Sequence, residues 1–168
     1  MVTRRDLRRC QALVAGLPLP QPFSVPALVD ALAARRGRPI HVRTLPPGSG
    51  GSACGAWIRL ATADVIYVEE KTSRVHREHI VLHEIGHLLC DHTGAGGGAH
   101  PLARVLPDLS PELIERLLTR TGYSTEEEQE AELVASLIRT AAQARATWTT
   151  TGALREFETA LGLRGTWE

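Results

Sequence analysis

The sequence lacks the features that mark membrane-spanning, disulfide-stabilised and nucleic-acid-binding proteins. Its 168 residues contain no apolar run close to the ~20 residues that cross a bilayer. Its formal net charge is zero, which argues against the concentrated positive field that binds phosphate groups. The three cysteines are odd in number and too far apart for a disulfide framework or a zinc ribbon: Cys10, Cys54 and Cys90. We therefore expect no membrane and no nucleic acid as a direct partner.

The N-terminus shows no secretory signal. Four arginines cluster there, Arg4-Arg5 and Arg8-Arg9, but no apolar segment follows them. On a helix their side chains would share one side, and we interpret them as a solvated face. Without a signal and without a disulfide framework, the chain is expected to be cytoplasmic. Its 43% apolar and 23% charged residues are ordinary for a globular protein, so we predict one domain over 1–168.

The pattern that carries chemistry is His83-Glu84-Ile85-Gly86-His87, an H-E-x-x-H pentapeptide inside an apolar run. Residues four apart lie on one face of a helix, so His83 and His87 can bind a single zinc ion. Glu84 follows the first ligand and can reach a water on the metal. Buried polar side chains need partners, because each unpaired one costs about 1–3 kcal/mol, and a metal ion would supply one. Gly86 costs a helix about 1 kcal/mol relative to alanine, which a close approach by another backbone would justify.

Hydrophobic periodicity and turn residues predict an α+β fold with a small antiparallel or mixed sheet packed against the motif helix. The predicted elements are N-terminal helices at 3–15 and 24–37 (within 1–38), strands at 40–45, 53–60 and 64–69 (within 40–70), and the motif helix at 73–91. A Gly-rich loop, 92–101, is expected to be flexible. It leads to C-terminal helices within 108–163 that begin at Ser110-Pro111, at Ser124-Thr125 (running to about 145) and after Thr150-Thr151-Gly152.

A catalytic zinc site usually has three protein ligands, so a third ligand is expected elsewhere. The acidic helix start offers Glu128, which shares a face with Glu132 and lies beside the small residues Ala131 and Ala135. Glu128 would bind the metal while Glu132 accepts the other N–H of a zinc histidine. A competing interpretation is structural, because Thr125 with Glu128 forms a capping-box pattern.

Three residues just after the motif are weaker ligand candidates. Cys90 is interpreted as a buried structural cysteine. Asp91 and His92 are close in sequence, but a continuing helix axis would carry both past the metal.

His83-Glu84-Ile85-Gly86-His87-Leu88-Leu89, with 77–80 before it and 128–135 after it, resembles the ImmA/IrrE family of metallopeptidases. The resemblance covers roughly 57–139 and implies a zincin-like fold, with a small sheet before the motif helix. It also implies that Glu128 is the third metal ligand, with Glu130 as the alternative. Glu132 stands where the family has asparagine, Val134 replaces an aromatic residue, and the family's L-L-M-P ending is absent at 136–139.

The motif and the resemblance together predict a zinc-dependent endopeptidase. Glu84 would act as the general base. Tyr123 is a candidate to stabilise the oxyanion, as are four histidines: His76, His79, His92 and His100. The strand at 65–68 could pair with an extended substrate, as sheet edges do. The resemblance implies a helix-turn-helix repressor as the protein substrate.

Two other functions remain open from the sequence. The protein could be a regulatory binding module that keeps its metal but cuts little, in which case Glu84 would be dispensable. The same metal triad could also hydrolyse a non-peptide substrate, because a fold and a motif do not specify the substrate.

Overall fold

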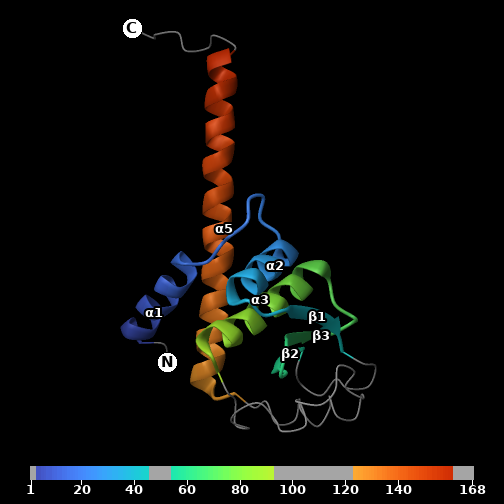
Figure 1. Ribbon diagram of the computed structural model, residues 1–168. Helices are drawn as coiled ribbons and strands as arrows, with labels where there is room; N and C mark the ends of the chain where they lie inside the picture. The colour runs from blue at the N-terminus through green and yellow to red at the C-terminus, as the bar shows by residue number, and fades with distance from the viewer. Residues whose placement is uncertain (1–2, 46–53, 93–122, 161–168) are drawn as a thin grey trace.

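The computed structural model describes residues 3–45, 54–92 and 123–160, which form an α+β arrangement (Figure 1). The predicted Gly-rich loop, apart from its first residue, and the start of the predicted helix at Ser110-Pro111 lie outside these residues, as does His100. The predicted α+β class is confirmed, and the sheet is mixed. The described elements are α1 (Arg4–Ala15), α2 (Val25–Arg36), β1 (Ile40–Thr44), β2 (Gly55–Arg59), β3 (Asp64–Val68), α3 (Arg74–Cys90) and α5 (Thr125–Ala160).

The first three helices begin at side chains that accept hydrogen bonds from free backbone N–H groups. Thr3 and Asp6 form a reciprocal capping box at α1, with the Asp6 carboxylate 2.9 Å from the Thr3 nitrogen. Ser24 caps α2, which ends at Gly37 in the left-handed conformation, with φ of 62°. Ser73 caps α3 by accepting from the His76 N–H at 3.2 Å. These starts agree with the predicted ranges, because each cap is a local interaction.

The three strands lie in the order β1-β3-β2, with β1 parallel and β2 antiparallel to β3. β3 is buried on both faces: Ile66 and Val68 join the main core, whereas Val65 and Tyr67 pack in a smaller cluster on the other face. The expectation that the strand at 65–68 offers a free edge to a substrate is therefore wrong. β3 is the central strand, and among the described strands β1 and β2 form the edges.

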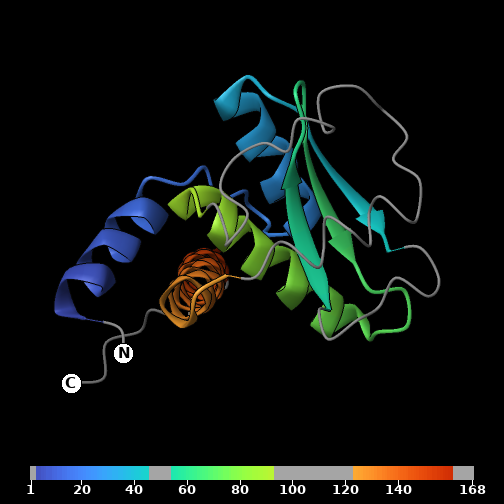
Figure 2. The same ribbon diagram turned by 90° about the horizontal axis from the view of Figure 1, so that it is seen from below.

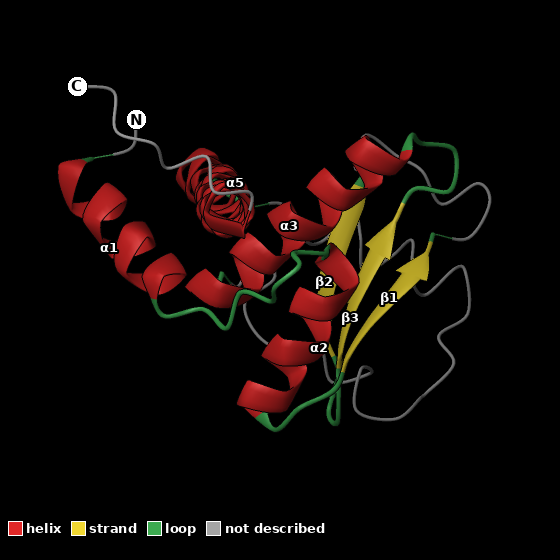
Figure 3. Cartoon of the chain, turned by 90° about the horizontal axis from the view of Figure 1, so that it is seen from above, coloured by secondary structure: helices red, strands yellow, loops and turns green. Residues whose placement is uncertain are grey.

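The motif helix α3 lies between the sheet and α5, as the views along the α5 axis show (Figures 2 and 3). α2 lies on the same face of the sheet, and α1 packs on α5 away from the sheet. Burying one large aliphatic side chain contributes about 1.5–3 kcal/mol, so this core holds α3 from both sides. Among the described residues, the large aliphatic side chains of the core that are fully buried are Leu28, Leu32, Ile66, Val68, Leu82, Ile85, Leu88, Val134 and Ile138.

A buried carboxylate fixes the strand nearest the motif helix. Asp64 at the start of β3 accepts hydrogen bonds from the Trp57 indole N–H and from Arg38 Nε, each at 3.2 Å. The backbone N–H of the same Trp57 donates to Glu84 of the motif. Asp64 thus holds β2 in a position where its backbone meets α3.

The C-terminal helix α5 is one helix from Thr125 to Ala160, and its far part extends past the other described elements (Figure 1). The predicted break at Thr150-Thr151-Gly152 is wrong. A glycine costs a helix only about 1 kcal/mol and threonine less, which is too little to end a helix without a competing cap or proline. Within the described residues, no helix is apolar enough over sufficient length to cross a membrane.

Candidate metal centre

Three side chains from two helices converge at one point. His83 and His87 of α3 direct their Nε2 atoms toward each other at 3.1 Å. Glu128 of α5 places Oε2 3.2 Å from His83 Nε2 and Oε1 3.8 Å from His87 Nε2. Zinc bonds of about 2.0–2.2 Å at tetrahedral angles separate neighbouring ligand atoms by roughly 3.3–3.6 Å. The three residues therefore fit a zinc ion in both ligand type and spacing.

Glu128 reaches this point because α3 and α5 approach unusually closely. A β-carbon added to Gly86 would lie 2.6 Å from the Ala131 carbonyl oxygen and 2.8 Å from its Cα. Ala131 and Ala135 on the facing side of α5 are fully buried. The close backbone approach that would justify a glycine inside the motif is thus present, and the small residues of α5 permit it.

The capping box at the start of α5 does not involve Glu128. Ser124 Oγ accepts from the Glu127 N–H at 3.3 Å, and the Glu127 carboxylate accepts from the Ser124 N–H at 2.8 Å. The predicted alternative, in which Thr125 and Glu128 form the capping box, is therefore wrong, because each role belongs to the preceding residue. That shift leaves the Glu128 carboxylate facing the two histidines.

Glu84 is buried against β2 and lacks a full set of partners. It is 5% exposed, and it accepts a hydrogen bond from the Trp57 backbone. Its Oε2 has no hydrogen-bond partner among the described residues. Burial and the nearby Glu128 charge raise the pKa of Glu84 to about 8. Such an orphaned oxygen beside three potential ligands is where a polar ligand is needed.

His87 is held as a neutral imidazole. Burial, followed by the charges of His83 and His92, lowers the pKa of His87 to about 3. The neutral ring is the form that binds metal. Tyr123 stacks on this ring with centroids 3.7 Å apart and planes 16° apart. Burial, with the charges of Glu84 and Glu128, raises the Tyr123 pKa, so its hydroxyl keeps its proton as a hydrogen-bond donor.

Glu132 lies beside the first histidine of the motif. Its Oε2 is 3.5 Å from His83 Nδ1 and 3.1 Å from His79 Nε2. Glu132 is thus placed to contact the nitrogen of His83 that faces away from His87. His76, another candidate, is exposed in the first turn of α3.

His92 is not in the group of three converging residues, but the chain does not carry it away along the helix axis as the sequence predicted. α3 ends at Cys90, and Asp91 adopts a left-handed conformation with φ of 56°. The chain then folds back, so that the His92 N–H bonds to the His87 carbonyl at 3.0 Å. The His92 ring follows, with Nδ1 3.0 Å from His87 Nδ1. The contact between His92 and His87 was not predicted from the sequence, because it depends on this turn at Asp91.

Glu130, the alternative ligand, lies on the other side of the His87 ring from His83 and Glu128. Its Oε2 is 3.0 Å from His92 Nε2, and its Oε1 forms an ion pair with Arg9 of α1. Burial opposes ionisation of Glu130, but the hydrogen bonds from His92 and Arg9 prevail and hold its pKa below the usual value. Arg9 is therefore not simply part of a solvated face.

A second group of three donors lies near the end of α3: Cys10, Cys90 and Glu130 lie within 4.8 Å of one another. Both Glu130 oxygens already have partners. Burial raises the pKa of both thiols, that of Cys90 to about 12. Cys90 remains interpreted as a structural cysteine.

The donor set of two imidazoles and one carboxylate is one that zinc accepts. No protein-family model, curated protein or solved structure matches this chain. The support for a metal centre is therefore the geometry of His83, His87 and Glu128, together with the orphaned oxygen of Glu84.

Proposed function

We propose that this protein is a zinc-dependent endopeptidase of the zincin type. His83, His87 and Glu128 would hold the metal. The proposal rests on the buried Glu84 Oε2, which lies beside the three converging ligands and has no hydrogen-bond partner within the described part of the chain. Bound zinc would lower the pKa of a water and polarise the scissile carbonyl.

Glu84 is the general base of the proposed reaction. Its Oε1 is held against β2, where a β-carbon on Gly55 would lie 2.9 Å from it, which leaves Oε2 free among the described residues. A bound zinc ion would favour the ionised form of Glu84 against the burial that raises its pKa, so that Oε2 could accept the proton of the attacking water. Glu84 then returns that proton to the leaving amine. Tyr123, stacked on His87 and protonated, donates a hydrogen bond to the oxyanion.

The substrate is a protein segment in extended conformation. β2 replaces β3 as the strand that would receive it, because β2 is an edge among the described strands and its Trp57 N–H faces Glu84. The resemblance to the ImmA/IrrE family extends this proposal to a helix-turn-helix repressor.

Incubation of zinc-loaded protein with purified repressors tests the proposal. A discrete pair of fragments is expected with the wild type and none with Glu84→Gln. Glu78→Gln, the same change six residues earlier on α3, is the matched control and should cut normally, because Glu78 pairs with Arg74 rather than with the site. Repressor binding without cleavage would favour the regulatory binding module.

A further inference from the structure

A chain of contacts leads away from the proposed metal centre to the N-terminal helix, and its first two contacts are buried. His87 Nδ1 lies 3.0 Å from His92 Nδ1, and His92 Nε2 lies 3.0 Å from Glu130 Oε2. Glu130 Oε1 then forms an ion pair with Arg9. His87 is 1% exposed, and His92 and Glu130 are each 8% exposed, so water competes little for the His87–His92 and His92–Glu130 contacts, whereas the Arg9 side chain is 56% exposed.

Only one arrangement of protons on the neutral rings satisfies this chain. If His87 binds metal through the lone pair of Nε2, its proton is on Nδ1 and is donated to His92 Nδ1. His92 then carries its proton on Nε2 and donates it to the Glu130 carboxylate. In the opposite arrangement, a bare His92 Nε2 would face a carboxylate oxygen, and the two lone pairs would repel. The carboxylate therefore selects the tautomer of His87 that binds metal.

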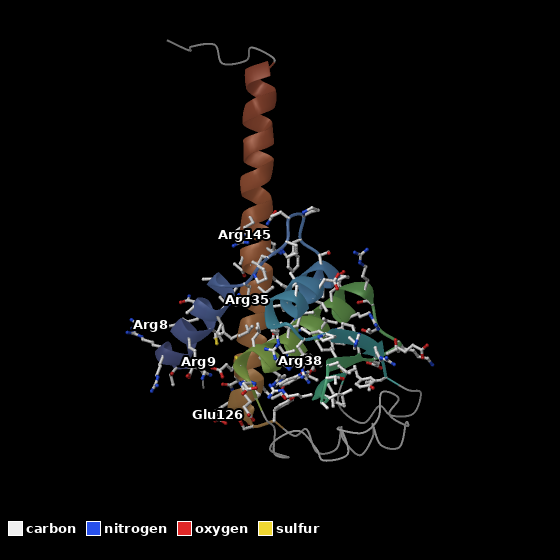
Figure 4. All side chains as sticks on the ribbon, viewed as in Figure 1. Arg8, Arg9, Arg35, Arg38, Glu126 and Arg145 are labelled. Atoms are coloured by element: carbon white, nitrogen blue, oxygen red, sulfur yellow. The ribbon has the colours of Figure 1, made fainter. Side chains whose placement is uncertain are left out.

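We propose that His92 and Glu130 are positioning residues that fix the ring orientation and tautomer of His87 for metal binding. The inference rests on the metal site of the proposed function. Arg9 of α1 forms an ion pair with Glu130 and thereby links α1 to the site. Figure 4 labels Arg9 on α1 and Glu126 in the first turn of α5. Partners of this kind behind a metal-binding histidine raise metal affinity by holding it in place.

Glu130 could instead bind a metal ion together with Cys10 and Cys90, which lie close to it. The contacts favour the positioning role. Both Glu130 oxygens already have partners: Oε2 accepts from His92, and Oε1 pairs with Arg9 and accepts from the Cys10 thiol at 3.8 Å. A metal bound here would have to displace an ion pair and two thiol protons.

The test measures the zinc affinity of the full chain by competition with a chromophoric chelator. His92→Ala and Glu130→Ala should each bind zinc about 10–100-fold more weakly than the wild type. Glu126→Ala removes an exposed carboxylate from the same helix and should change nothing. Glu130→Gln should recover part of the loss, because its amide oxygen still accepts from His92 Nε2.

Two further readouts separate positioning from general structural damage. Melting of the metal-free proteins reports any loss of fold. Long-range ¹H–¹⁵N NMR of the zinc-loaded wild type reports the tautomers directly, with protons expected on His87 Nδ1 and His92 Nε2. This measurement needs no variant, so it decides the inference even if a substituted chain fails to fold.

Wild-type zinc affinity in both His92→Ala and Glu130→Ala, or a proton on His92 Nδ1, would overturn the inference while leaving the metal site intact. A second zinc that is lost in Cys10→Ser or Cys90→Ser would also overturn it, by making Glu130 a ligand. If His83→Ala retains all zinc binding, the proposed metal site itself fails.

Discussion

Gly86 of α3 faces the backbone of Ala131 in α5 so closely that a β-carbon on Gly86 would lie 2.6 Å from the Ala131 carbonyl oxygen. Backbone atoms on both sides leave no flexible side chain to move aside. This contact sets the separation of the helix that carries the two histidines from the helix that carries Glu128. The glycine of the motif is therefore part of the geometry of the site.

Gly86→Ala tests whether that contact outweighs helix propensity. Propensity alone predicts a gain of about 1 kcal/mol. Overpacking predicts a loss of about 1–3 kcal/mol and a displaced α5, hence weaker zinc binding. We expect the melting temperature and the zinc affinity both to fall. A more stable variant with normal zinc affinity would show that the helices can separate without cost.

Glu127→Ala and Glu128→Ala should have opposite effects. Glu127 belongs to the capping box with Ser124, so its loss should cost about 1 kcal/mol of stability and leave zinc affinity unchanged. Glu128 faces the histidines, so its loss should weaken zinc binding by more than roughly 100-fold, beyond the effect of removing an outer contact. Melting curves and zinc titrations of the two variants provide the comparison. The reverse pattern would return Glu128 to a capping role.

Glu84→Gln should separate metal binding from catalysis. The amide keeps the size of the side chain and can still accept from the Trp57 backbone, so zinc binding and fold should be retained. Hydrolysis should fall by roughly 10²–10⁴-fold, because the amide accepts no proton from water. Single-turnover cleavage of a repressor substrate measures the rate. Undiminished cleavage would remove Glu84 from the mechanism.

The three cysteines should differ in reactivity. Cys54 is exposed, whereas Cys10 is fully buried and burial raises the pKa of Cys90 to about 12. Because the thiolate is the reactive form, a disulfide reagent at pH 8 should modify one thiol per native chain quickly and the others only on unfolding. Cys54→Ser should abolish the fast phase. Fast reaction of Cys90 would contradict the packing of α3 against α1 and α5.

Features that depend on short-range interactions were predictable from the sequence. His83 and His87 meet because four residues make about one helical turn, and Thr3, Ser24 and Ser73 begin their helices through bonds to residues three further on. The α+β order followed from the same local patterns.

Features that depend on a single backbone conformation or on pairing at a distance were not predictable. The position of His92 depends on the left-handed conformation of Asp91, which nothing in the sequence indicates. The central position of β3 depends on its pairing with β1, although β2 lies between these two strands in the sequence. The alternation of apolar residues does not encode which strands pair. The capping box begins at Ser124 rather than at Thr125, so its carboxylate belongs to Glu127 and not to Glu128.

The central claim is that His83, His87 and Glu128 bind one zinc ion. Anomalous diffraction at the zinc edge from crystals of the zinc-loaded protein tests it most directly. We expect one strong peak about 2.0–2.2 Å from His83 Nε2, His87 Nε2 and a Glu128 oxygen. A peak between Cys10, Cys90 and Glu130 instead, or no peak near the two histidines, would contradict it.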